Sequence, residues 1–222
     1  MSRNARPHPS LFLFTYQLRV VVLLALTLLA GIAQGATAKK DAKPLDDYEQ
    51  RIADQALWKE LRQNPGYVLL IPAAEAHGDQ RPASPDTAKC YQRFNLTDHG
   101  ATVARHFYNS MRRHDIRKAL TYSSQWCPAL ETATRLGLGY VHEMALLNDL
   151  PADSETARKL QIMQLKSWAN DLQYNHKNLL VLVAHTSIMA ALSGNTPEPQ
   201  HMQVMKYNTR DKLIYVGSVP LD

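Results

Sequence analysis

The polar side chains best suited to chemistry follow three short apolar runs of this chain. His185 comes directly after the run 178–184, which is the strongest strand signal in the sequence. Glu131 lies in the segment Ser123–Ala133 after a second run, and Pro72–Glu75 follow a third. Sites in open α/β sheets form at the carboxyl ends of the strands, so we expect these segments to meet at one edge. His185 is then either a pocket-lining residue or a structural histidine.

The remaining histidines are not spaced as metal ligands. His99 and His106 lie seven residues apart on one face of an expected helix, which permits proximity but not chelation. We therefore predict no metal site, and no feature of the sequence calls for a cofactor.

Short apolar runs alternate with amphipathic segments, which favours a mostly parallel sheet covered by helices on both faces. Strands, including a C-terminal hairpin, are predicted over Tyr67–Ile71, Ala119–Ser123, Tyr140–Val141, Asn178–Ala184, Met202–Tyr207 and Leu213–Val219. Helices are predicted over 46–61, from Thr97, over 125–135, over 153–172 and up to Leu192. The predicted fold class is α/β, a three-layer α/β/α sandwich with a mostly parallel central sheet.

The longest predicted helix covers residues 153–172. Asp153 or Ser154 is a suitable N-terminal cap. The apolar face of this helix is expected to consist of Leu160, Met163, Leu165 and Trp168.

Residues 1–38 differ from the rest of the chain. They hold three arginines, no acidic residue, the apolar run 20–30 and two small-residue motifs that resemble export cleavage sites, which is typical of a secretory signal peptide. The apolar stretch 20–33 has 14 residues, short of the roughly 20 that span a bilayer, so cleavage is favoured over retention as an anchor. We expect an exported protein, periplasmic or secreted, with one domain over residues 39–222. Membrane contact is expected only through an uncleaved signal segment.

Most of the net charge belongs to that N-terminal segment. The full chain has 25 basic and 20 acidic side chains, a formal net charge of +5. Without the three arginines of residues 1–38, 22 basic and 20 acidic side chains remain, a net charge of +2. The basic cluster 111–118 lies at an expected helix end, where cations favour the helix dipole. A nucleic-acid partner is therefore not expected.

Several motifs, taken in order, resemble the histidine phosphatase superfamily, the phosphoglycerate-mutase-like group. The resemblance runs from about Tyr67 to Tyr215 and is most specific in the block Ser123–Ala133. Its landmarks are Tyr67–Leu70 with Ala74–Ala76, Asn95–Gly100, Ser123–Cys127 with Leu130–Ala133, Leu147–Asn148 and Val181–His185. It implies the phosphoglycerate-mutase-like fold and the exported, single-domain branch of that superfamily.

Enzymes of that superfamily transfer phosphoryl groups through a phosphorylated histidine, while arginines hold the phosphate oxygens. The resemblance implies an Arg-His pair directly after the first strand, where this chain has Pro72 and Ala73. A second arginine is implied where the chain has Pro128. A third arginine is implied at the position of Phe94, and Arg93 lies one position away. Uncharged residues therefore replace the nucleophile and most of the phosphate clamp.

His185 is the one charged pocket position of the superfamily that this sequence matches. The resemblance gives it the polar neighbours Asn95, Glu131 and Asn148. Loss of one positioned donor typically lowers a rate about 100-fold, so the loss of the nucleophile together with the clamp predicts an inactive protein.

A replacement nucleophile would have to come from the loop after the first strand. His77 lies four residues beyond Ala73, with Arg81 nearby. Four extended residues span up to roughly 13 Å, so this loop would have to fold back over the pocket to bring the imidazole to a phosphate. A solvent-exposed loop histidine is the simpler interpretation.

Cys90 and Cys127 are the two cysteines of the chain, and an even pair permits one disulfide in an oxidising compartment. There is no C-x-x-C motif of the metal or redox type. In the superfamily pattern both cysteines flank pocket-forming loops, which makes them candidates for a disulfide.

Three functions remain open. The favoured hypothesis is an exported histidine-phosphatase-like protein without catalytic activity, which binds an unknown small molecule or protein as a binding or regulatory module. The alternative is an active phosphatase that hydrolyses a phosphate monoester with His185 or His77. The third is a pocket rebuilt for an uncharged ligand, because proline, alanine and phenylalanine make the site more apolar.

Overall fold

The computed structural model of this chain describes residues 47–77, 90, 95–175, 178–208 and 212–221. Four of the sequence-based expectations lie outside these residues: the N-terminal segment 1–38, Arg81, Arg93 and Phe94. Within the described ranges, no helix is both long enough and apolar enough to cross a membrane.

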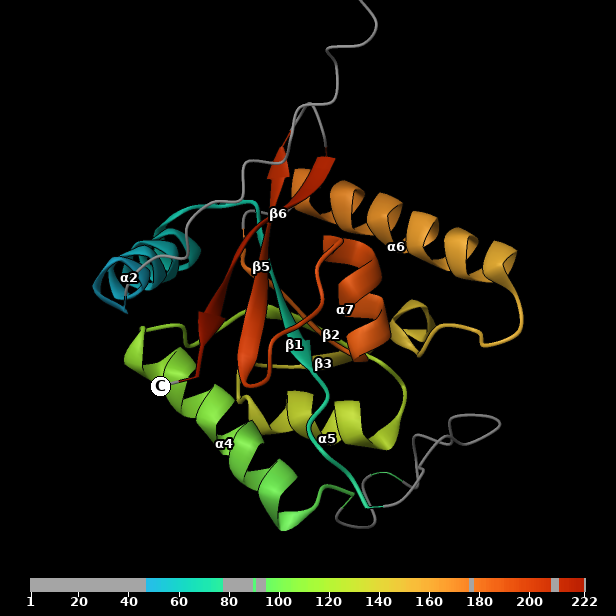
Figure 1. Cartoon of the computed structure of the whole chain (residues 1–222), viewed down its shortest axis with the longest axis horizontal. Helices are drawn as coiled ribbons and strands as arrows, with labels where there is room; N and C mark the ends of the chain where they lie inside the picture. Colours follow the sequence, from blue (N-terminus) through green and yellow to red (C-terminus); the bar gives the residue numbers. More distant parts are fainter. Residues whose placement is uncertain (1–46, 78–89, 91–94, 176–177, 209–211, 222) are drawn as a thin grey trace, which may run out of the picture. The chain divides into compact units, whose positions relative to one another are not determined.

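In the described part of the chain, six strands form one sheet in the order β3-β2-β4-β1-β5-β6 (Figure 1). Strands β1 to β4 run parallel to one another, whereas β5 is antiparallel to β1 and pairs with β6 in a hairpin. The strands are β1 Tyr67–Pro72, β2 Leu120–Ser123, β3 Val141–Glu143, β4 Leu180–Ala184, β5 His201–Asn208 and β6 Lys212–Pro220. The prediction of a mostly parallel sheet with a C-terminal hairpin is confirmed.

The described helices are α2 Asp47–Gln63, α4 Asp98–Arg113, α5 Cys127–Arg135, the 3-10 helix η1 Ala145–Leu147, α6 Glu155–Asn175 and α7 Thr186–Ser193. Side chains cap two of them. The Thr97 hydroxyl accepts from the N–H of Gly100 at 2.9 Å at the start of α4, and the Ser154 hydroxyl accepts from the N–H of Ala157 at 3.2 Å at the start of α6. These caps explain why both helices begin close to the expected residues.

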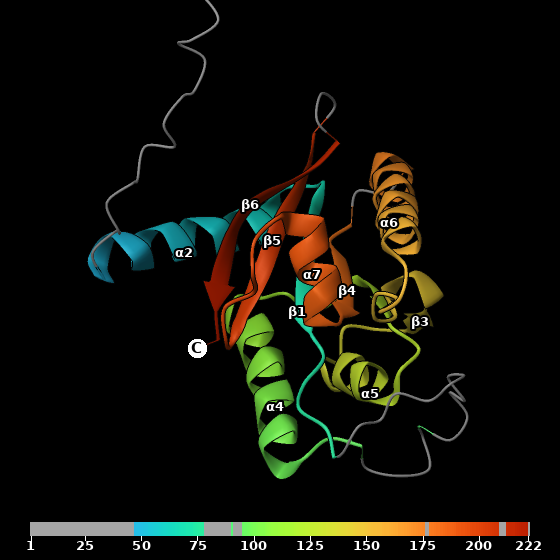
Figure 2. The same ribbon diagram turned by 45° about the vertical axis from the view of Figure 1, so that its right-hand side comes forward.

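Two hydrophobic cores cover the two faces of the sheet. Successive residues of a strand point to opposite faces, so Leu69 and Ile71 pack with α2, α4 and α5, whereas Val68 and Leu70 pack with α6 and α7. Figures 1 and 2 show the two helical layers on either side of the sheet. The described domain is therefore a three-layer α/β/α sandwich, as the sequence predicts.

The apolar face of α6 differs from the expected one. Leu165 and Ala169 are fully buried and Trp168 packs beside them, but Leu160 and Met163 are 47% and 61% exposed. With 3.6 residues per turn, the stripe through Leu165 and Ala169 lies on the opposite side of the helix from Leu160 and Met163. The prediction that these two residues belong to the apolar face is wrong.

Candidate functional site

The carboxyl ends of β1, β2 and β4 bring three segments of the chain together. The N–H of Ala73 donates to the Ala184 carbonyl at 2.9 Å, and the N–H of Ser124 donates to the Val183 carbonyl at the same distance. The residues that directly follow the three strands, Ala73, Ser124 and His185, are therefore neighbours at one edge of the sheet.

A hydrogen-bond network fixes the position of His185 at this edge. His185 is half-buried, and its Nε2 lies 3.1 Å from the hydroxyl oxygen of the buried Ser124. The Ser124 hydroxyl donates to Asn148 Oδ1 at 2.9 Å and accepts from the Trp126 N–H at 3.2 Å. The N–H of Gln125 donates to Asn148 Oδ1 at 2.8 Å, and its side-chain oxygen accepts from Asn148 Nδ2 at 3.2 Å. Both contacts with Gln125 orient the Asn148 amide.

This network assigns the proton between Ser124 and His185. Asn148 Oδ1 is an acceptor, and the single hydroxyl proton of Ser124 is directed to it. The Ser124 oxygen therefore accepts from His185, so that Nε2 of the imidazole carries a proton. His185 is a hydrogen-bond donor to the protein at this nitrogen.

The indole of Trp126 packs against the imidazole of His185. Their ring centroids are 4.3 Å apart with an interplanar angle of 63°, which is an edge-to-face arrangement. Trp126 is half-buried and directly precedes α5. The edge of the sheet thus combines an oriented imidazole with an aromatic side chain.

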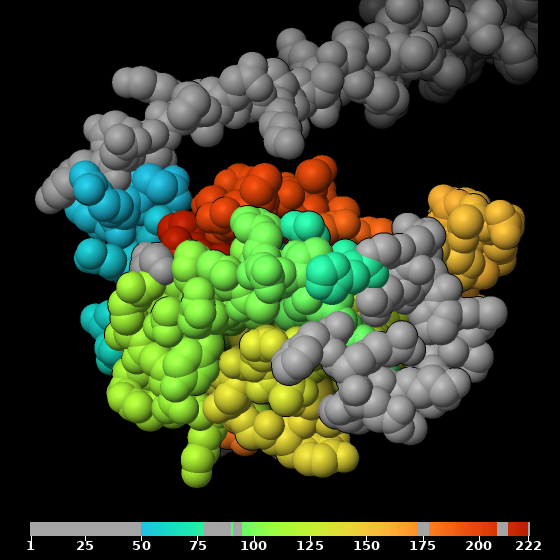
Figure 3. Space-filling view, turned by 90° about the horizontal axis from the view of Figure 1, so that it is seen from below, coloured from blue at the N-terminus to red at the C-terminus, as the bar shows by residue number. Residues whose placement is uncertain are grey.

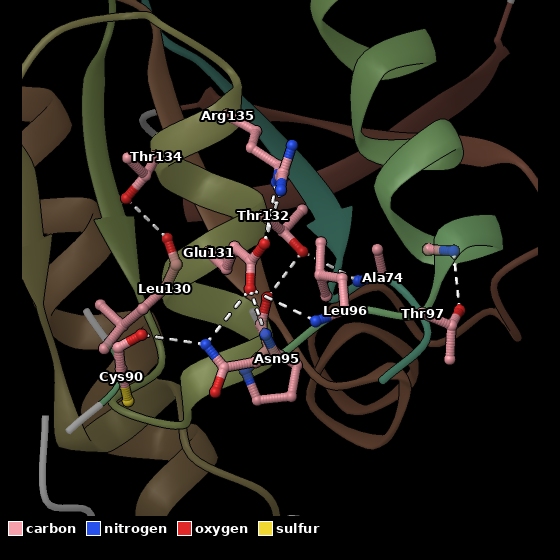
Figure 4. A network of polar contacts seen from close by, with 12 residues as sticks. Ala74, Cys90, Asn95, Leu96, Thr97, Leu130, Glu131, Thr132, Thr134 and Arg135 are labelled. Atoms are coloured by element: carbon pink, nitrogen blue, oxygen red, sulfur yellow. Dashed lines mark hydrogen bonds and ion pairs between the residues drawn. The ribbon is translucent and has the colours of Figure 1, made fainter. Parts of the chain in front are cut away.

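Glu131 of α5 anchors the segment that precedes α4 (Figure 4). Its Oε2 accepts from the Asn95 N–H at 2.7 Å, the Asn95 amide at 3.2 Å and the Leu96 N–H at 3.3 Å, and its Oε1 pairs with Arg135 at 2.7 Å. Burial raises the pKa of Glu131, but the hydrogen bonds from Asn95, Arg135 and Leu96 outweigh it and lower the pKa below its ordinary value. Glu131 therefore acts as an ionised anchor.

The first turn of α5 is uncharged and is tied to the segment after β1. Pro128 is buried in that turn, where a proline is well tolerated. The Thr132 hydroxyl donates to the Pro128 carbonyl at 2.7 Å and accepts from the Ala74 N–H at 3.0 Å (Figure 4). The backbone next to Ala73 is therefore fixed by a neutral hydroxyl.

Cys90 and Cys127 form a disulfide, which joins the start of α5 to a residue 37 positions earlier. The Cys90 carbonyl accepts from the Asn95 amide at 3.0 Å. Because Asn95 also donates to Glu131, the disulfide and the carboxylate hold the same segment against α5.

The segment after β1 packs against the start of α4, which Figure 3 shows in teal and green. His77 is exposed there, and its N–H donates to the Asn95 carbonyl at 3.1 Å. Gly100 of α4 lies so close to this segment that a Cβ at its position would be 2.0 Å from the Glu75 carbonyl oxygen. A glycine is therefore required at this contact.

The structure adds two residues that the sequence did not single out as site residues. Ser124 and Trp126 contact His185, and both lie in the segment between β2 and α5. Their place after a strand was a usable signal, but their contact with His185 depends on the pairing of β2 with β4. Among the described residues, no group of three or more histidine, cysteine or acidic side chains is arranged to hold a metal ion.

By sequence, no protein-family model and no curated protein matches the chain. By structure, it is similar to the protein histidine phosphatase SixA, solved in complex with tungstate, with a TM-score of 0.52, 14% identity and coverage of 69% of this chain and 96% of SixA. The fold is that of the histidine phosphatases. An Escherichia coli K-12 protein to which alpha-ribazole-5'-P phosphatase activity is ascribed matches with a TM-score of 0.53 and 13% identity, covering 71% of this chain and 97% of that protein.

The histidine phosphatase fold accounts for the arrangement of the site. Its parallel strands β1, β2 and β4 are adjacent in the sheet, so the residues after them converge although they are far apart in sequence. At 13–14% identity this likeness concerns the fold, and the activity has to be argued from the side chains at the edge.

Proposed function

We propose that this chain is an exported protein with the histidine phosphatase fold that does not transfer phosphoryl groups and acts as a binding or regulatory module. The observation that carries the proposal is the position of Ala73. Its N–H is bonded to the carbonyl of Ala184, the residue before His185. The position where the superfamily pattern requires the nucleophilic histidine is therefore occupied by a methyl group, which cannot accept a phosphoryl group.

The cations that would bind a phosphate are replaced as well. Pro72 ends β1 and Pro128 lies buried in the first turn of α5, so neither position offers a guanidinium. Phosphoryl transfer depends on such charges because negative charge is spread over the oxygens of the transferred group. The side chains that contact His185 at this edge, Ser124 and Trp126, instead offer a neutral hydroxyl and an aromatic ring.

The alternative, an active phosphatase, would have to use His185 or His77. Nε2 of His185 donates to Ser124. His77 is exposed, and its backbone is bonded to Asn95. These contacts support a binding role for His185, with Trp126 as an aromatic surface for an uncharged group of the ligand.

Two further features support export. The segment 1–38 has the order of a secretory signal peptide. The disulfide between Cys90 and Cys127 is of the kind that persists in oxidising compartments. The intact mass of the protein recovered from the periplasm or the medium tests this part of the proposal. We expect a chain that begins near residue 39, whereas full-length protein held in the membrane fraction would contradict it.

An aryl phosphate assay tests the loss of activity. Purified protein is incubated with p-nitrophenyl phosphate from acidic to neutral pH, beside the variants His185→Ala and His77→Ala. We expect the same background release from all three proteins. Turnover by the wild type that disappears in either variant would show an active phosphatase and would identify the histidine that it uses.

A further inference from the structure

The Cys90–Cys127 disulfide is joined directly to the aromatic side chain of the His185 edge. Cys127 is the first residue of α5, and the residue before it, Trp126, packs its indole against the His185 imidazole with 4.3 Å between the ring centroids. The Trp126 N–H donates to the Ser124 hydroxyl, which also bonds His185. A movement of the backbone at Cys127 therefore reaches Trp126 through one peptide bond.

The first turn of α5 depends on this disulfide because no side-chain hydrogen bond caps the helix. The hydroxyls of Thr97 and Ser154 cap α4 and α6, whereas the cap position of α5 is occupied by Trp126, whose side chain makes no capping bond. Only the backbone carbonyl of Trp126 closes the turn, by accepting from the N–H groups of Ala129 and Leu130. A helix start without a side-chain cap frays easily, so a covalent bond at Cys127 contributes much of its order.

The second turn of α5 is held without the disulfide. Glu131 accepts from the N–H groups of Asn95 and Leu96, and the Thr132 hydroxyl accepts from the N–H of Ala74 (Figure 4). These bonds join α5 to the segments after β1 and before α4. Opening of the disulfide is therefore expected to loosen the first turn and to leave the domain folded.

We propose that the Cys90–Cys127 disulfide is a redox switch of the His185 edge. In the oxidised state Trp126 and His185 form one packed surface. A dithiol reductant opens the bond, the first turn of α5 loosens, and the indole leaves the imidazole, which keeps its contact with Ser124. The switch rests on the proposed binding role of this edge, to which it adds a second state.

The reduction is a thiol–disulfide exchange in two steps. Cys127 is half-buried and Cys90 is only 6% exposed, so the first thiolate of the reductant attacks Sγ of Cys127, and Cys90 leaves as a thiolate. The second thiolate attacks the reductant's own sulfur in the mixed disulfide, and Cys127 leaves. The start of a helix stabilises a departing thiolate at this position. Two electrons pass to the protein, the reductant becomes a disulfide, and its two thiol protons neutralise the two cysteines.

NMR of the His185 ring protons in the native protein tests the switch, with dithiothreitol as the dithiol and thiol alkylation to verify reduction. The ring current of the indole shifts these resonances, and Trp126→Leu supplies their position without an indole. We expect reduction to move them at least halfway to that position. The double variant Cys90→Ser with Cys127→Ser should show the shifted resonances without reductant. Unchanged His185 resonances in the reduced protein, or a disulfide that dithiothreitol opens only in urea, would overturn the proposal.

His142 is the matched control for His185. Its imidazole packs on Tyr122 and on Tyr140, with 4.8 Å between the ring centroids in both pairs, and none of these residues belongs to α5. Reduction should leave the His142 resonances and the circular dichroism unchanged. Equal shifts of both histidines, or loss of the helical signal, would overturn the proposal, because the disulfide would then hold the whole domain. Phosphatase activity in the aryl phosphate assay would contradict the binding role itself, whatever His185 does on reduction.

Discussion

The Ser124 hydroxyl lies 3.1 Å from Nε2 of His185, although 61 residues separate the two in sequence. The contact exists because β2 pairs with β4 in a parallel register that aligns Ser123 with Val183. Since the hydroxyl also donates to Asn148, the imidazole is held in one orientation with a proton on Nε2. A side chain fixed in this way is prepared to bind a ligand without losing rotational freedom on binding.

The Ser124→Ala variant is expected to lose about 1–3 kcal/mol of the free energy of unfolding. The change removes the buried acceptor of the Trp126 N–H and of His185 Nε2. A donor that loses its partner in such surroundings lowers the free energy of unfolding. Urea unfolding measures the difference. Thr156→Ala, at an exposed position of α6, is the control and should stay within about 0.5 kcal/mol.

The same variant tests the proton assignment. In the wild type, ¹⁵N spectra should show His185 with a proton on Nε2, the resonance being identified by its absence in His185→Ala. Ser124→Ala removes the partner of Nε2 and should lower the share of His185 that carries its proton there. A wild-type His185 with its proton on Nδ1 would contradict the network described for this edge.

The Glu131→Gln variant should be less stable than the wild type by about 2 kcal/mol at pH 7, because charge-assisted hydrogen bonds to the Asn95 and Leu96 N–H groups are weakened. The pKa of folded Glu131 lies below the ordinary value of about 4.5 for a glutamate. Its carboxylate therefore stabilises the fold above that value, and the contribution is lost as the pH falls through the folded pKa. The difference between the two proteins should shrink below pH 4.5.

An exposed carboxylate serves as the control for Glu131. Asp115 pairs with Arg117 on the surface, with more than 60% of each side chain exposed. Such pairs contribute little, so Asp115→Asn should change the free energy of unfolding by less than about 0.5 kcal/mol from pH 7 to pH 4. A difference between wild type and Glu131→Gln that stays constant over this range would show that the charge of Glu131 is unimportant.

The fold was predictable because its signals are local. The runs 67–71 and 179–184 are continuously apolar, as expected of strands that are buried on both faces, and they became β1 and β4. Helix starts were predictable within two residues where Thr97 and Ser154 cap the chain. Met163 was misassigned because a helix with several apolar residues admits more than one apolar face, and only packing against the sheet selects among them.

The site was less predictable because its contacts are not local. His185 could be singled out from its place after a strand, but the roles of Ser124 and Trp126 depend on strand pairing across 61 residues. The contribution of Glu131 was also hidden, since its partners are backbone N–H groups 35 and 36 residues away. Sequence identifies residue types, whereas the partners of backbone groups emerge only from the folded chain.

Reduction of the Cys90–Cys127 disulfide should lower the free energy of unfolding by about 2–4 kcal/mol. The bond closes a loop of 37 residues and therefore restricts the unfolded chain. Urea unfolding with and without reductant measures the effect. The double variant Cys90→Ser with Cys127→Ser should be as stable as the reduced wild type, and reductant should not change its free energy of unfolding. Equal stability of oxidised and reduced protein would show that the Glu131 anchor holds the segment at Asn95 without the bond.

The Gly100→Ala variant should lose about 3 kcal/mol of the free energy of unfolding, because the added Cβ would lie 2.0 Å from the Glu75 carbonyl oxygen. Both sides of this contact are backbone, so the segment after β1 has to move away from α4. That movement would stretch the hydrogen bond from the Ala74 N–H to Thr132. Hydrogen exchange should therefore show faster exchange at Ala74, whereas His99→Ala, at an exposed position in the same turn, should change neither quantity. A Gly100→Ala protein as stable as the wild type would mean that the start of α4 and the segment after β1 are not in close contact.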